Sequence, residues 1–137
     1  MIQRIQSVWL LLAGILALLT VQFPTYSGMN TGETTFKLLN GREAGFGVLF
    51  VTILVAVLAF VAIGMYKNRP MQLKLCVGGL LAEAVLFFLY YRQISHFTQG
   101  TYALASLLHP VIILLFVLAA KGIREDEKLI RESDRLR

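Results

Sequence analysis

Cysteine and charged residues are both scarce in this sequence. The chain of 137 residues contains one cysteine, Cys76, which excludes an intramolecular disulfide and any metal site built from several cysteines. Charged residues make up 15% of the chain, against roughly 25% in an average soluble domain. Hydrophobic residues make up 57%. This balance is typical of an integral membrane protein.

Motifs of known catalytic or cofactor sites are also missing. The sequence has no glycine-rich phosphate loop, no paired histidines at metal-binding spacing and no nucleophile elbow. Its serines stand outside any catalytic motif, and little of the chain is polar enough to build a soluble active-site domain. We therefore expect a protein that is not an enzyme, and the sequence calls for no cofactor or metal.

Four apolar runs are each long enough to cross a bilayer as a helix, which takes about 20 residues. They cover residues 5–23, 44–66, 73–91 and 102–120. A cleaved signal peptide is the alternative to the first span, because Arg4 precedes an apolar core. The bulky residues at 23–26 do not resemble a cleavage site, however.

The predicted fold is all-α, an integral membrane four-helix bundle over residues 1–120 followed by a charged cytoplasmic helix over residues 121–137. Short connections make spans two and three, and spans three and four, antiparallel neighbours. The polar segment 25–43 is rich in turn formers, and residues 34–38 have weak strand character. A small hairpin on the membrane surface and an irregular loop both fit this segment.

The distribution of lysine and arginine predicts the orientation in the membrane. Segments 25–43 and 92–100 carry three of these residues, at positions 37, 42 and 92. The opposite side carries the other ten, at positions 4, 67, 69, 74, 121, 124, 128, 131, 135 and 137. Both termini are therefore expected in the cytoplasm.

Three polar residues are expected at one depth inside the membrane. Glu83, His109 and Thr52 each lie seven or eight residues from the outer end of their span, which is roughly 11–12 Å at the rise of an α-helix. Glu83 and His109 can therefore meet, with Thr52 close by. A carboxylate beside an imidazole can share a proton, as in transporter relays. The alternative is a buried hydrogen bond that fixes how the two helices dock.

Small residues four positions apart predict close contact between helices. Ala13 and Ala17 have this spacing in the first span, and Gly78 and Ala82 have it in the third. Such pairs allow two backbones to approach in a membrane bundle.

The charged tail has a narrow apolar stripe. Ile123 and Ile130 are seven residues apart, as are Leu129 and Leu136, so a helix would carry them along one side. The stripe suits docking to a cytoplasmic partner or to anionic lipid. A solvated tail that stops membrane transfer is the alternative. The acidic run at residues 125–127 argues against nucleic acid as a partner.

Both ends of the chain are similar to a family of unknown function. The opening reads MIQRIQSVWL over residues 1–10, and the end reads GIREDEKLIR over residues 122–131 and DRLR over residues 134–137. These motifs resemble the family of the domain of unknown function 4293, small four-span membrane proteins of Bacteroidota. The resemblance implies a bacterial inner-membrane protein and brings no activity, cofactor or catalytic residue.

Two functions of different classes fit the sequence. The favoured one is a non-catalytic accessory or scaffold subunit, which would contact the lipid bilayer and a membrane-protein partner or further copies of itself. The other is a small oligomeric transporter or proton-linked channel that uses Glu83 and His109.

Overall fold

The computed structural model describes residues 2–32 and 34–137, with only the backbone described at residues 2–4 and 30. In this part the chain forms four α-helices, one short 3-10 helix and three strands. In chain order they are α1 (Ile2–Gln22), β1 (Tyr26–Asn30), β2 (Phe36–Leu39), α2 (Phe46–Gly64), α3 (Arg69–Ile94), β3 (Phe97–Tyr102), η1 (Leu104–Leu107) and α4 (Leu108–Arg135).

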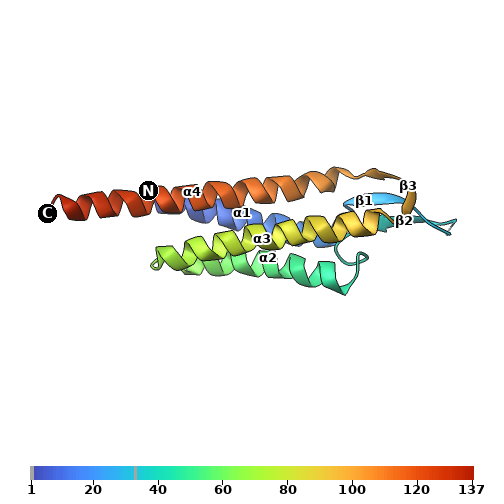
Figure 1. Cartoon of the computed structure of the whole chain (residues 1–137), viewed down its shortest axis with the longest axis horizontal. Coiled ribbons are helices and arrows are strands. Elements are labelled where there is room, and N and C mark those ends of the chain that lie inside the picture. The colour runs from blue at the N-terminus through green and yellow to red at the C-terminus, as the bar shows by residue number, and fades with distance from the viewer. Residues whose placement is uncertain (1, 33) are drawn as a thin grey trace.

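The helices form an elongated bundle in which each runs antiparallel to the next (Figure 1). α1 packs against α2 and α4, and α3 packs against the same two helices. The strands lie at one end of the bundle, the sheet end. The α2–α3 turn and the last turns of α4 lie at the opposite end, the tail end, where α4 runs on beyond the other helices.

The bundle has small side chains inside and large apolar ones outside. The helix residues that pack its core include seven alanines: Ala13, Ala17, Ala56, Ala59, Ala62, Ala82 and Ala119. Large apolar side chains such as Leu11, Phe50, Leu81 and Leu114 are exposed on the outer faces of the four helices. Helices that associate in lipid pack in this way, because small residues let backbones approach and the outer face contacts apolar chains. All four are long and apolar enough to cross a membrane, which indicates a membrane protein.

Two helices begin four or more residues away from the predicted start. α3 begins at Arg69 rather than residue 73, because the Asn68 side chain accepts a hydrogen bond from the Met71 N–H at 3.3 Å and Pro70 lies in the first turn. α4 begins at Leu108, six residues after the predicted start. A helix that began at residue 102 would have Pro110 in its interior, where the ring would collide with the carbonyl of Ser106, whereas a start at Leu108 puts Pro110 in the first turn, where it is tolerated.

The sheet corrects the all-α expectation. β1 is central and pairs antiparallel with both β2 and β3, so the hairpin alternative for residues 25–43 is the one that forms. The third strand comes from the segment between spans three and four, where we expected only a connection. Gly28 lies opposite Gly100, and a Cβ at Gly28 would collide with the backbone of Gln99. Two residues without side chains thus allow β1 and β3 to pair.

The charged tail is a direct continuation of α4. The helix runs without a break from Leu108 to Arg135, so residues 121–135 share its axis with the fourth span. Asp126 is the last buried residue, and we call residues 127–136, the nine helical residues that follow it and the C-cap residue Leu136, the α4 extension.

Candidate functional site

The structure brings Glu83 and His109 together in the core of the bundle. The Nδ1 atom of His109 on α4 lies 2.6 Å from Oε1 of Glu83 on α3. Both side chains are almost completely buried. The short contact joins two helices that pack on each other mainly through apolar side chains. It can serve as a hydrogen bond or, if the imidazole is protonated, as an ion pair.

Two aromatic side chains of α3 enclose the imidazole. The ring of Tyr90 lies 5.1 Å from that of His109 between centroids, and the ring of Phe87 lies at 5.9 Å. These residues follow Glu83 by seven and four positions, so the three lie on one face of α3. Sequence reasoning did not identify them as part of the site, although their spacing from Glu83 is a signal that would have done so.

Each partner of the pair keeps one polar atom without a hydrogen bond among the described residues. These atoms are Oε2 of Glu83 and Nε2 of His109, and both are shielded from solvent. A buried polar atom without a partner is costly, and in native proteins it marks strain, a functional role, or a place for water or ligand.

A cavity of about 130 Å³ lies beside the imidazole at the sheet end. His109 contributes to its wall, together with Phe87, Tyr90 and Tyr91 of α3. The rest of the wall includes Thr25 just before β1, Tyr102 at the end of β3 and Ser106 in η1. The sheet and the 3-10 turn therefore build the cavity, which explains why the helical pattern of the sequence did not predict it.

Thr52 is buried, but its hydroxyl bonds within its own helix. It donates to the carbonyl of Val48 at 2.7 Å, one turn earlier in α2. The predicted polar layer therefore consists of a close pair, Glu83 and His109, and a threonine whose hydrogen bond is already satisfied.

A second polar contact between α3 and α4 lies at the tail end. Nη2 of Arg69, the first residue of α3, lies 3.6 Å from Oδ2 of Asp126. Both side chains are mostly buried. Sequence reasoning assigned Arg69 to the positive flank of the membrane and Asp126 to the acidic run. It did not pair them because no local spacing connects residues 57 positions apart.

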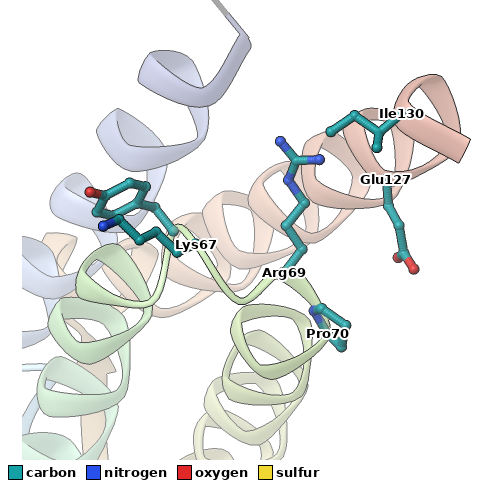
Figure 2. Close-up of a pocket in the computed structure, with 6 residues that line it drawn as sticks. Lys67, Arg69, Pro70, Glu127 and Ile130 are labelled. Atoms are coloured by element: carbon teal, nitrogen blue, oxygen red, sulfur yellow. The ribbon is translucent and has the colours of Figure 1, made fainter. Parts of the chain in front are cut away.

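An open pocket of about 490 Å³ lies beside this contact, between the α2–α3 turn and α4. Figure 2 shows Lys67 in the α2–α3 turn and Arg69 and Pro70 at the start of α3, with Glu127 and Ile130 on the facing helix. Tyr66 also lines it. At the base of the α4 extension, the pocket therefore brings the cationic Lys67 and Arg69 and the acidic Glu127 close to the apolar side chain of Ile130.

The four residues predicted to dock a partner fall into two groups. Ile123 is fully buried in the bundle, so it belongs to the core and is not available to a partner. The reason is that the bundle continues two turns beyond the predicted end of the fourth span. Leu129, Ile130 and Leu136 are 53%, 46% and 89% exposed.

The site offers no metal centre in the part of the chain that the structure describes. No group of three or more His, Cys, Asp or Glu side chains is placed there to hold an ion. Cys76 is buried in α3, consistent with a packing role.

Comparison with protein-family models matches residues 2–136 to the family described as domain of unknown function (DUF4293). The match covers nearly the whole chain, from the first turn of α1 to the end of the α4 extension. No curated protein and no solved structure matches the chain.

Proposed function

We propose that this chain, which belongs to the DUF4293 family, is a non-catalytic accessory subunit of a membrane assembly and binds its partner through the α4 extension. Within this proposal the bundle spans the inner membrane of a bacterium. The tail end lies in the cytoplasm and the sheet lies on the outer side. The partner is a membrane protein that presents a helical segment in the cytoplasm.

The dimensions and the charge of the bundle support this placement. α2 has 19 residues, about 28 Å at the rise of an α-helix, which matches the hydrocarbon core of a bilayer. Large apolar side chains cover the outer faces of all four helices. Ten of the thirteen lysines and arginines belong to the tail-end side, which favours its retention in the cytoplasm.

The observation that carries the docking proposal is the direction of α4. Figure 1 shows the α4 extension running straight on from the bundle instead of bending away from it. In a membrane-spanning bundle a straight continuation leads away from the bilayer, by about 13 Å for nine residues. Leu129 and Leu136 are therefore held away from lipid, and a protein surface is the better way to cover them.

Charge on the extension favours a helical partner over a lipid surface. Basic residues along it are interleaved with acidic ones, as in the pairs Lys128–Glu132 at 3.8 Å and Arg131–Glu127 at 3.4 Å. An interfacial helix bound to anionic lipid would instead have a uniformly basic polar face. Beside the extension, the pocket places the cationic Lys67 and the acidic Glu127 next to Ile130, which suits a partner surface that also mixes both charges with apolar side chains.

The test is affinity purification of full-length tagged protein from native membranes in mild detergent, with the bound proteins measured by mass spectrometry. One variant carries Leu129→Ser and Leu136→Ser. Its matched control carries Lys128→Ser and Arg135→Ser, which have the same spacing on a neighbouring face of the helix. We expect one membrane protein at fixed stoichiometry with wild type and the control, and its loss with the leucine variant.

Two results would contradict this proposal. One is a partner that is retained equally by the leucine variant, because the extension would then not be the contact. The other is recovery of the protein only with itself, which would identify a homo-oligomer in place of an accessory subunit.

The Glu83–His109 contact favours one alternative, a small oligomeric transporter or proton-linked channel. Such a protein would need Glu83 to gain and lose a proton during each cycle. Glu83→Gln, which keeps a hydrogen-bond acceptor, would then abolish flux in liposomes while the bundle stays folded. The accessory-subunit proposal expects full assembly of this variant with the partner and no flux with either protein.

A further inference from the structure

Beside the cavity, one polar atom of His109 has no hydrogen-bond partner among the described residues. Nδ1 of the imidazole faces Glu83, and Glu83 does not line the cavity. Nε2 is therefore the ring nitrogen left for another group, and it has no hydrogen-bond partner among the described residues. The side chain is more than nine-tenths buried, so its position and tautomer are set by the protein.

The charge balance of the pair makes Nε2 a donor. With a single shared proton the pair would carry a net negative charge, which is costly in an apolar interior. Protonation of Glu83 at Oε2 would leave a buried O–H donor without a partner. The remaining neutral arrangements are an imidazolium beside a carboxylate and a neutral imidazole beside a carboxylic acid protonated at Oε1, and in both Nε2 carries a hydrogen while Nδ1 and Oε1 share the other proton. A ligand at this position must therefore supply an acceptor oxygen.

The size and lining of the cavity define the rest of the ligand. Its volume of about 130 Å³ is close to that of cavities of about 150 Å³ that accept benzene. Aromatic side chains form much of the wall, which suits a flat ring. Tyr91 and Tyr102 line the cavity and are largely exposed at the sheet end, where aromatic rings favour the membrane interface. The cavity is thus placed to receive a molecule from the membrane or from the outer solution.

We propose that this cavity binds a single six-membered ring carrying a carbonyl oxygen, such as a benzoquinone head group, and that Nε2 of His109 donates a hydrogen bond to that oxygen. The proposal uses the placement of the bundle in a membrane but not the docking of a partner at the α4 extension. The ring can come from a quinone dissolved in the membrane or from a small soluble molecule of the same chemistry.

The experiment measures binding by equilibrium dialysis against full-length protein in lipid nanodiscs, with empty nanodiscs as the background. Three probes are compared. Tetramethyl-1,4-benzoquinone has the ring, four methyl groups and two carbonyls. 1,2,4,5-Tetramethylbenzene has the same ring and methyl groups without an acceptor. A decyl-substituted benzoquinone adds a chain that resides in the membrane. We expect saturable binding of the first at one per protein and about tenfold weaker binding of the second, because a hydrogen bond is lost.

A variant that fills the cavity tests the location. Ser106→Phe places a ring in the space without changing Glu83 or His109, and we expect at least about tenfold weaker quinone binding because the volume is occupied. Leu107→Phe is the matched control, since this neighbouring side chain is exposed and does not line the cavity. If Ser106→Phe does not fold, Ile94→Phe fills the same cavity from α3 and decides the question.

Much tighter binding of the decyl probe would identify a membrane quinone as the source, and equal binding would identify a small soluble ring. The proposal is overturned if no quinone binds, if tetramethylbenzene binds as well as the quinone, or if both cavity-filling variants leave binding unchanged. The Leu129→Ser and Leu136→Ser variant is expected to bind the quinone normally, so failure of partner docking remains a separate result.

Discussion

Two polar contacts join the same pair of helices, α3 and α4, at different places in the bundle. Glu83 and His109 meet at 2.6 Å with side chains 0% and 4% exposed. Arg69 and Asp126 lie 3.6 Å apart at the tail end, with side chains 18% and 12% exposed. The first contact is short and sealed among apolar side chains. The second is longer and lies where the bundle opens toward the charged tail.

The difference shows that surroundings decide what a polar contact contributes. In an apolar interior each unpaired polar group is costly, so removing one partner penalises the other. Arg69 and Asp126 are also mostly buried, but they keep some contact with solvent at the end of the bundle, so losing one partner costs less there. We therefore infer that Glu83 and His109 fix how α3 docks on α4, while Arg69 and Asp126 make a smaller contribution at the end of that interface.

The largest effect is expected from Glu83→Leu. It leaves Nδ1 of His109 buried without a partner, so the free energy of unfolding should fall by about 1–3 kcal/mol. Glu83→Gln keeps an acceptor and should cost clearly less. The measurement is reversible unfolding in mixed micelles, followed by circular dichroism.

A double substitution gives the matching control. Glu83→Leu with His109→Leu removes both polar groups and should recover much of the loss, because an apolar pair leaves nothing unsatisfied. Equal stability of wild type and Glu83→Leu would show that the buried contact is no more important than the one at the tail end.

A smaller loss in the free energy of unfolding is expected from overpacking the interface between α3 and α4 at Gly79. A Cβ at Gly79 would lie 2.6 Å from the ring of Phe116, which is fully buried on α4. Gly79→Ala should therefore destabilise the bundle by about 1–2 kcal/mol through overpacking.

Gly78→Ala is the control for this substitution. The nearest atom to its new methyl group would be Cδ1 of Leu58 at 3.8 Å, an ordinary contact, so alanine's helix propensity should make it neutral or stabilising. The same unfolding assay compares the two neighbours. A result in which Gly78→Ala is the more harmful would mean that α3 is rotated relative to the structure.

Arg69→Ala should cost about 1–2 kcal/mol, because it leaves the mostly buried carboxylate of Asp126 without its ion-pair partner, although the shortened side chain makes room for water at the end of the bundle. The loss should shrink further as salt is raised from low to high concentration. Unfolding of wild type and variant at two ionic strengths measures both effects. A loss as large as that of Glu83→Leu would remove the distinction between the two contacts.

The smallest effect on folding is expected in the α4 extension. Leu129→Ser and Leu136→Ser lie beyond the bundle and should change the free energy of unfolding by less than about 0.5 kcal/mol each. Their effect should appear in partner binding instead. If either unfolds the bundle, the leucine packs within the chain and does not form a docking surface.

The helices and the buried pair could be predicted from the sequence because both depend on simple regularities. Uninterrupted apolar runs identified four helices, and the even rise of an α-helix placed Glu83 and His109 at one depth. In the structure their side chains are in contact, while their depth in a membrane stays a prediction. The role of the pair, structural or proton-responsive, remains a prediction.

Features that depend on contacts distant in sequence could not be predicted in the same way. β3 forms because Gly100 fits against Gly28, 72 positions earlier, and neither glycine indicates the other. In α3 the close approach occurs at Gly79 rather than at Gly78, since only the packed structure fixes which face meets Phe116.

The most direct test of the accessory-subunit account is photo-crosslinking in native membranes, with a photoreactive residue at position 129 or 136. Position 135, on a neighbouring face of the α4 extension, is the control. The account predicts one protein adduct of defined mass from both leucine positions and little from position 135. Adducts to lipid alone, or no adduct at either leucine, would contradict it.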